Sequence, residues 1–258
     1  MLDLSDYSLT SILITSLAVM AVASELGRLL GKREESRDRA NVATLEAAVL
    51  GLLALMIGFT FAMALSRFDG RRDGVLSEAN AIGTTALRAR LLPAPHDAEV
   101  LKLLQEYVQV RLDITQHIPT AAQLDAAIKR SNALQEELWQ QAMTVAASDK
   151  EVVPTGLFIQ ALNEMIDNHE KRMTALRNRV PNSVLLALYG VATISSAFAG
   201  YASGLGARPS RLPIYVMILL VAGVILLIQD LDRPGTGFIT VSQQPMVDTA
   251  ASIAGYIH

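Results

Sequence analysis

Charge-free stretches alternate with charged ones along this chain, and the pattern predicts four membrane-spanning helices. Each charge-free stretch has at least about 18 residues, the length at which an apolar segment becomes a candidate span. A backbone in lipid must satisfy its own hydrogen bonds, so each stretch is expected to be helical. The four stretches are Tyr7–Ser24, Ala47–Ser66, Asn182–Gly206 and Leu212–Gln229.

The stretch Ala47–Ser66 continues into a charged, helix-compatible segment that begins at Arg67. About 20 residues at about 1.5 Å per residue cover a bilayer core of roughly 30 Å. A spanning helix that continues out of the lipid as a soluble helix is expected to be one rigid rod.

Two rows of residues follow the second stretch at helical spacing. Ala54, Gly58 and Ala62 form a small-residue row suited to close helix packing in lipid. The neighbouring row is apolar, and such a row packs in a core, faces lipid or, in a symmetric oligomer, lines a pore. The pore-lining candidates of this row are Leu52, Leu55, Phe59 and Met63.

The third stretch has a small-residue row of its own, formed by Ala192, Ser196, Gly200 and Gly204. This row is predicted to pack against another helix inside the membrane.

The first stretch lacks a positively charged start and is expected to remain as a span rather than to be cleaved as a signal peptide. Glu25 and Arg28, three residues apart near its end, are expected to form an ion pair.

Residues 67–181 show helical spacing of apolar residues and no strand alternation, which predicts a soluble bundle of amphipathic helices. Breaks are expected at Pro93–Pro95, Pro119, Val153–Gly156 and Pro181. The last bundle helix is expected to flow into the third span, with Pro181 near the interface. The predicted bundle helices are Asp97–Gln116, Ala121–Ala147 and Thr155–Arg179.

The fold class is therefore all-α: a polytopic membrane protein with a helical bundle inserted between its second and third spans. The predicted domains are residues 1–66 (two spans), 67–181 (bundle), 182–233 (two spans) and 234–258 (tail). In the tail we expect an extended piece at Gly237–Val241 and a small helix from Asp248. Lys and Arg residues near the helix ends are divided almost evenly between the two sides, so the orientation stays open.

Composition removes several classes of function. Of the 258 residues 51% are hydrophobic and 18% charged, below the roughly 25% charged residues of soluble domains. The net charge is −3 and no basic stripe stands out, so nucleic acid is not an expected partner. Cysteine is absent, which excludes disulfides and Cys-based zinc sites.

Residues typical of catalysis are sparse, and we expect neither an enzyme nor a cofactor. No two histidines stand at metal-ligand spacing, and His169, within the acidic segment Glu164–Glu170, is expected on a solvated helix face. No phosphate loop, nucleophile elbow or H-E-x-x-H motif is present. Charged residues beside the second span either brace the structure or border a pore mouth or vestibule. These candidates are Glu46, Arg67, Glu78 and Arg88.

Several segments resemble a known family. Gly58-Phe59, followed by Ser66-Arg67-Phe68, resembles the second helix of bestrophins. The chain as a whole looks more specifically like the bestrophin-like domain family of bacterial membrane proteins. The segments that carry this second likeness are Arg67–Asp69 with Arg71-Arg72, Glu78–Thr84, Leu87–Pro93, and Asp230–Pro234 with Gly237–Ile239.

The resemblance implies a homo-oligomer, by analogy a pentamer, that conducts small inorganic ions, because bestrophins are pentameric anion channels with a hydrophobic neck. Phe59 and Leu55 would face that neck. It also implies a bacterial inner membrane location with a cytoplasmic bundle and termini. Phe68 stands where bestrophins have Trp, and Asp230 and Asp232 are too few to predict the calcium site of animal bestrophins.

Two functions from different classes remain open. One is an oligomeric ion channel with a hydrophobic neck on the second span. The alternative is a non-channel membrane scaffold or sensor whose helical bundle binds a partner. An intramembrane enzyme has no paired acid, histidine or nucleophile within the spans to support it.

Overall fold

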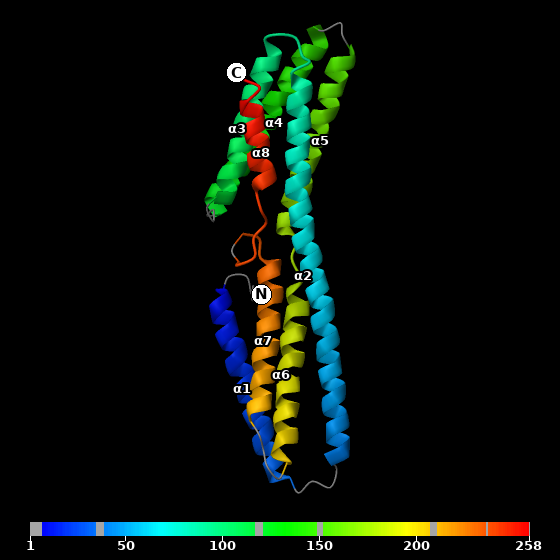
Figure 1. Cartoon of the computed structure of the whole chain (residues 1–258), viewed down its shortest axis with the longest axis vertical. Helices are drawn as coiled ribbons and strands as arrows, with labels where there is room; N and C mark the ends of the chain where they lie inside the picture. Colours follow the sequence, from blue (N-terminus) through cyan, green and yellow to red (C-terminus); the bar gives the residue numbers. More distant parts are fainter. Residues whose placement is uncertain are drawn as a thin grey trace. The chain divides into compact units, whose positions relative to one another are not determined.

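The computed structural model describes residues 7–34, 39–116, 121–148, 152–206, 211–235 and 237–257, and these residues form helices and no strands (Figure 1). The all-α prediction is confirmed. The helices are α1 (Leu9–Arg33), α2 (Arg39–Ala89), α3 (His96–Gln116), α4 (Ala121–Ser148), α5 (Val152–Arg177), α6 (Asn182–Gly204), α7 (Leu212–Asp232) and α8 (Gln244–Ala254).

The chain divides into two compact units. Unit 1 comprises Met1–Phe68 and Arg179–Ile239, and unit 2 comprises Asp69–Asn178 and Thr240–His258. The division falls inside α2, whose first part belongs to unit 1 and whose second part belongs to unit 2. Each unit has its own hydrophobic core.

Four stretches of helix among the described residues are long and apolar enough to cross a membrane. Their apolar windows are largely unburied within the chain, as expected for surfaces that face lipid or another molecule. The stretches are Leu9–Arg33, Asn41–Ala89, Val153–Gly204 and Leu212–Asp232.

The last bundle helix does not flow into the third span, contrary to the prediction. α5 ends at Arg177 and α6 begins at Asn182, after Pro181 in an extended conformation with φ −57° and ψ 134°. Proline has no N–H and disfavours a helical residue before it, so it begins a helix more readily than it continues one. The Pro181 carbonyl accepts the N–H of Val184 at 2.9 Å.

Two further expectations about helix ends are corrected. Pro154 lies in the first turn of α5 rather than in a break, because the missing N–H of proline is not needed there. In the tail, α8 starts at Gln244 rather than Asp248, with Met246 and Ile253 buried. The break expected at Pro119 lies outside the described residues.

Glycines bring α1 and α6 of unit 1 together at backbone distance. A Cβ on Gly27 would lie 2.0 Å from the Ala197 carbonyl oxygen, and one on Gly200 would lie 2.0 Å from the Ser24 carbonyl oxygen. Gly204 makes a similar approach to α1. The small-residue row predicted on the third span is therefore a packing face.

Replacing Gly200 with alanine is expected to lower the thermal unfolding temperature of the purified protein markedly. The new methyl group would force α1 and α6 apart, and overpacking of this kind costs about 1–3 kcal/mol or more. Gly190 of the same helix supplies the control, because a Cβ there meets nothing within 4 Å. Equal melting temperatures for Gly200→Ala and Gly190→Ala would contradict this account of the packing.

The predicted ion pair near the end of α1 is present. Arg28 Nη2 lies 2.5 Å from Glu25 Oε2, and Arg28 is buried. The Tyr215 hydroxyl of α7 donates a hydrogen bond to Glu25 Oε1 at 2.7 Å. The pair therefore also joins α1 to α7.

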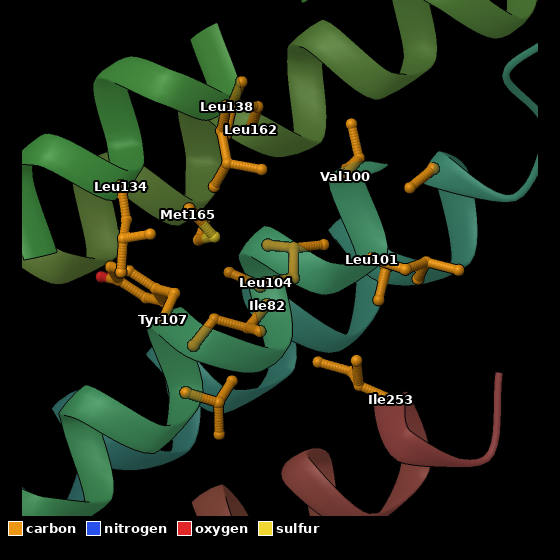
Figure 2. Close-up of a cluster of buried hydrophobic side chains, with 14 of the residues drawn as sticks. Ile82, Val100, Leu101, Leu104, Tyr107, Leu134, Leu138, Leu162, Met165 and Ile253 are labelled. Carbon is orange, nitrogen blue, oxygen red and sulfur yellow. The ribbon is translucent and has the colours of Figure 1, made fainter. Parts of the chain in front are cut away.

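The core of unit 2 combines apolar side chains from α2, α3, α4, α5 and α8 (Figure 2). Ile82 of α2 and Leu104 of α3 lie at its centre, and Leu162 and Met165 of α5 close one side. Ile253 adds α8 to the same cluster. This packing holds the second part of α2 with one face inward.

Candidate functional site

One face of α2 in unit 1 has no cover within the described chain. Leu52, Leu55 and Phe59 are 49%, 54% and 67% exposed. Met63 differs, because it is half-buried and packs against the unit 1 core. Three of the four pore-lining candidates thus share an open apolar face. The side of α2 turned into the unit carries the buried residues Leu53, Thr60 and Ala64.

The small-residue row of α2 is also open. Ala54, Gly58 and Ala62 are exposed, and a Cβ on Gly58 would meet nothing within 4 Å. The predicted packing partner of this row is therefore not a helix of the described chain. A long, smooth and apolar helix face remains available to another molecule.

Three of the charged vestibule candidates are half-buried: Glu46, Arg67 and Arg88. Arg88 Nη1 donates a hydrogen bond to the Leu157 carbonyl at 2.8 Å, which joins α2 to α5 inside unit 2. Its guanidinium therefore has a structural contact as well as access to solvent.

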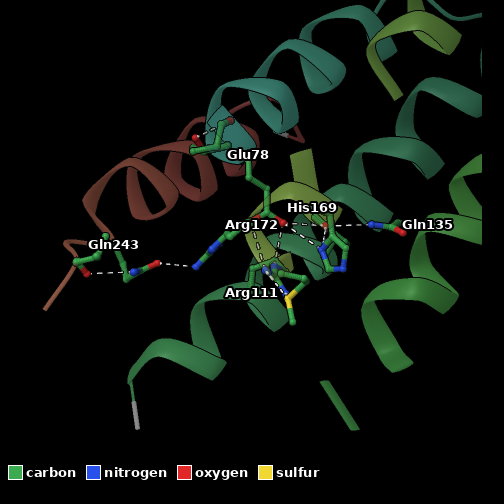
Figure 3. A network of polar contacts seen from close by, with 11 residues as sticks. Glu78, Arg111, Gln135, His169, Arg172 and Gln243 are labelled. Carbon is green, nitrogen blue, oxygen red and sulfur yellow. Dashed lines mark hydrogen bonds and ion pairs between the residues drawn. The ribbon is translucent and has the colours of Figure 1, made fainter. Parts of the chain in front are cut away.

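The fourth candidate, Glu78, is completely buried in unit 2 (Figure 3). Arg172 Nη1 donates to Glu78 Oε2 at 2.5 Å. Arg111 Nε lies 3.0 Å from Glu78 Oε1, and Arg111 Nη2 lies 3.4 Å from Oε2. The carboxylate therefore joins α2 to α3 and α5 and is not on the exposed face of α2.

Neutral groups complete the shell around this carboxylate. The Tyr107 hydroxyl donates to Glu78 Oε1 at 3.0 Å and accepts from Gln135 Nε2 at 3.3 Å. His169 Nδ1 lies 2.9 Å from the Tyr107 oxygen and 3.3 Å from Glu78 Oε1. His169 is 1% exposed, so the expectation of a solvated face for this histidine is wrong.

The tautomer of His169 follows from its other ring nitrogen. Nε2 is buried and has no hydrogen-bond partner among the described residues. A proton on Nε2 would be a buried donor without an acceptor, so we assign the neutral ring with its proton on Nδ1. That proton then points at the Tyr107 oxygen and the Glu78 carboxylate.

The electrostatics favour one ionised carboxylate. Burial by itself raises the pKa of Glu78, but the hydrogen bond from His169 and the charges of Arg111 and Arg172 outweigh it and lower the pKa to about 2. Burial raises the pKa of Tyr107, and the neighbouring Glu78 charge raises it further. At neutral pH the cluster therefore holds one carboxylate and two guanidinium groups.

The residues that surround Glu78 were not predicted from the sequence. Tyr107 and Arg111 stand four residues apart on α3, and His169 and Arg172 stand three apart on α5, so each pair shares one helix face. Polar pairs on the apolar face of an amphipathic helix are the signal that was available. Arg172 Nη2 also donates to Gln243 Oε1 at 2.9 Å, which connects the residues before α8 to the same cluster.

Comparison with known proteins identifies the family. Residues 12–246 match the sequence model of the family described as Bestrophin-like domain. The chain belongs to the bestrophin-like domain family. No curated protein matches it.

Solved structures of bacterial bestrophin homologues share the fold of this bestrophin-like chain. A Klebsiella pneumoniae homologue with a tryptophan-to-alanine substitution is 17% identical, with a TM-score of 0.67 and 97% of each chain covered. A second variant of that homologue is 16% identical, with a TM-score of 0.64 and 97% and 99% covered. A structure described as a membrane protein is 16% identical, with a TM-score of 0.65 and 95% and 97% covered. Together with its apolar helices, this likeness makes the chain an integral membrane protein.

The aspartates at the end of α7 accept backbone hydrogen bonds that fix the loop that follows in this bestrophin-like chain. Asp230 Oδ1 accepts the N–H of Phe238 at 2.7 Å, and Oδ2 accepts that of Ile239 at 3.1 Å. Asp232 Oδ1 accepts the Val180 N–H at 2.9 Å. A Cβ on Gly237 would lie 2.0 Å from Asp230 Oδ1, so a larger residue there would displace the carboxylate from its present position. Calcium prefers 6–8 oxygen ligands, and no group of three or more His or acidic side chains comes together in the described ranges.

Proposed function

We propose that this bestrophin-like protein forms a ring of identical chains, a pentamer by analogy, in which the α2 helices enclose a path for small inorganic ions. The observation that carries the proposal is the open face of Leu52, Leu55 and Phe59 on a helix that can span the membrane. This face is apolar and has no partner within the described part of its own chain, and contact between symmetric copies of the chain would supply one.

In such a ring the apolar side chains would form a hydrophobic neck. A narrow apolar constriction excludes water and thereby stops ions, and a small widening readmits both. Phe59 is the bulkiest exposed residue of the face and would set the narrowest point, with Leu55 one turn away. Met63 packs inward in the single chain and would contribute less.

Charged residues would border the path on either side of the neck. Glu46, Arg67 and Arg88 keep partial access to solvent and remain vestibule candidates. We assign Glu78 to the support of α2 instead, because its carboxylate is enclosed. We further propose that unit 2 and the termini are cytoplasmic in a bacterial inner membrane, and that the role is transport rather than catalysis.

Neutralising two acidic residues of α2 is expected to change ion preference. Asp69 and Asp73 are exposed and stand one turn apart in unit 2, so in a ring they would repeat in every chain and favour cations. The double variant Asp69→Asn with Asp73→Asn should lower the cation-to-anion permeability ratio, measured as a shift of the reversal potential in a salt gradient. Asp113→Asn, an exposed aspartate of α3, is the matched control. An unchanged ratio would place Asp69 and Asp73 off the ion path.

Two measurements test the proposal itself. Native mass spectrometry or imaging of the detergent-solubilised protein should show a closed ring, and planar-bilayer recordings of the reconstituted protein should show ion currents. A monomer or dimer that passes no current would end the channel proposal. That outcome would favour a scaffold or sensor, in which exposed leucines of unit 2 such as Leu87 and Leu91 contact a partner.

A further inference from the structure

Unit 1 contains a cavity between α1 and α6 that the channel proposal does not use. Its volume is about 310 Å³. For comparison, an engineered protein cavity of about 150 Å³ is large enough to bind benzene or xenon. The lining includes Ile12, Ser16 and Met20 of α1 and Leu186, Tyr189 and Thr193 of α6.

The cavity results from the way the two helices pack. Gly27 and Gly31 of α1 lie against the backbone of α6, and Gly200 and Gly204 of α6 lie against the backbone of α1, near one end of both helices. Towards the N-terminal end of α1 the two helices separate (Figure 1), and larger side chains such as Tyr189 line the space. A wedge-shaped space remains there because no glycine pair draws the backbones together.

Three hydroxyl groups on the cavity wall, those of Ser16, Tyr189 and Thr193, are already hydrogen-bonded within the chain. Ser16 Oγ donates to the Ile12 carbonyl at 2.6 Å, and Thr193 Oγ1 donates to the Tyr189 carbonyl at 2.8 Å. The Tyr189 hydroxyl accepts from Gln229 Nε2 at 2.9 Å. A buried water needs about 2–4 polar partners, and these groups offer little beyond their present bonds. The wall therefore favours an apolar occupant over water.

The helices that line the cavity are candidate membrane spans, so lipid is the apolar molecule available to fill it. Its walls come from the first and third candidate spans, at residues 7–20 and 186–193. The outer face of α1 is aliphatic, with Ile14, Val22 and Leu26 all more than half exposed. Within unit 1, α1 packs on α6 and α7, which lie between it and α2 (Figure 1). The cavity thus lies on the α1 side of unit 1, where the exposed side chains are aliphatic and suited to contact with lipid.

We infer that this cavity binds an acyl chain of a membrane lipid, held between α1 and α6. The inference requires only that unit 1 lies in a bilayer, so it stands independently of ion conduction. An acyl chain fills apolar space and needs no hydrogen bonds, which matches a wall lined by apolar side chains such as Ile12, Met20 and Leu186. The bound chain replaces the contacts that the separated helices cannot make with each other.

Photolabelling of the full-length protein tests the inference. The protein is reconstituted into vesicles of phosphatidylethanolamine and phosphatidylglycerol that contain a small fraction of phospholipid with a diazirine on its acyl chain. After illumination, mass spectrometry compares labelling of cavity-lining residues of α1 and α6 with labelling at Ile194, an exposed residue of α6. We expect severalfold stronger labelling in the cavity.

A pair of neighbouring substitutions supplies the matched control. Thr193→Phe fills the cavity and should reduce its labelling severalfold, whereas Ile194→Phe adds the same ring on the outer surface and should leave it unchanged. Ser16→Leu fills the cavity from α1 and keeps the test valid if Thr193→Phe does not fold. Labelling no stronger in the cavity than at Ile194, or unaffected by both filling variants, would overturn the inference.

Discussion

Replacing Phe59 with alanine should raise the single-channel conductance of the reconstituted protein severalfold. Phe59 is the most exposed of the pore-lining candidates, and its ring would project furthest from α2 into the proposed path. Removing it from every copy widens the neck and lowers the cost of admitting water, which in turn admits ions. The change is large because symmetry repeats it in each chain. Planar-bilayer recording at fixed voltage and salt measures it directly.

Leu65→Ala is the matched control for the Phe59 variant. Leu65 is also an exposed apolar residue of α2 in unit 1. It stands six residues from Phe59, which at about 100° per residue places it about 120° around the helix. We expect wild-type conductance from Leu65→Ala. Equal currents from the two variants and the wild type would remove Phe59 from the path, while a ring without current would reject conduction altogether.

Replacing Glu78 with glutamine should destabilise unit 2 severely. The substitution leaves the buried guanidinium groups of Arg111 and Arg172 without their shared carboxylate. Removing one partner of a buried ion pair costs about 3–5 kcal/mol, because the remaining charge stays buried without compensation. Trp139, the only tryptophan of the chain, packs against the core of unit 2 and reports its unfolding by fluorescence.

An exposed ion pair of the same unit supplies the comparison for Glu78. Glu106 lies 2.5 Å from Arg130, but both side chains are more than two-fifths exposed. Exposed pairs contribute little because water screens them. Glu106→Gln should therefore leave the Trp139 unfolding transition almost unchanged. Similar transitions for Glu78→Gln and Glu106→Gln would contradict the structural role of the buried cluster.

The pH dependence of stability provides a second test of the Glu78 cluster. The pKa of Glu78 falls from 4.5 to about 2 in the folded protein, so folding favours its ionised form. The stability that it contributes is complete above pH 4.5 and is lost as the pH falls through 4 towards 2. The slope of stability against pH in this window should be smaller in Glu78→Gln than in the wild type.

Much of the architecture follows from residues close together in the sequence. The length of each charge-free stretch identifies the helices that can cross a membrane, because lipid permits few alternatives to a helix. The row that contains Gly200 and Gly204 identifies a packing face, because small residues let backbones approach. Local reasoning fails where proline has two roles: Pro181 separates α5 from α6, whereas Pro154 lies inside the first turn of α5.

The sequence by itself determined the all-helical fold, the helices long and apolar enough to cross a membrane, and the apolar row with Phe59, because helix period and hydrophobicity are local properties. Only the tertiary structure decided which side of α2 faces inward. Asp73 and Glu78 are both carboxylates on one helix, yet Asp73 is exposed and Glu78 is enclosed. The difference depends on Arg111 and Arg172, which stand 33 and 94 residues from Glu78 in the chain. Contacts between residues so far apart exist only once the helices have packed; polar pairs on an apolar helix face mark the residues locally but do not say which partners they meet.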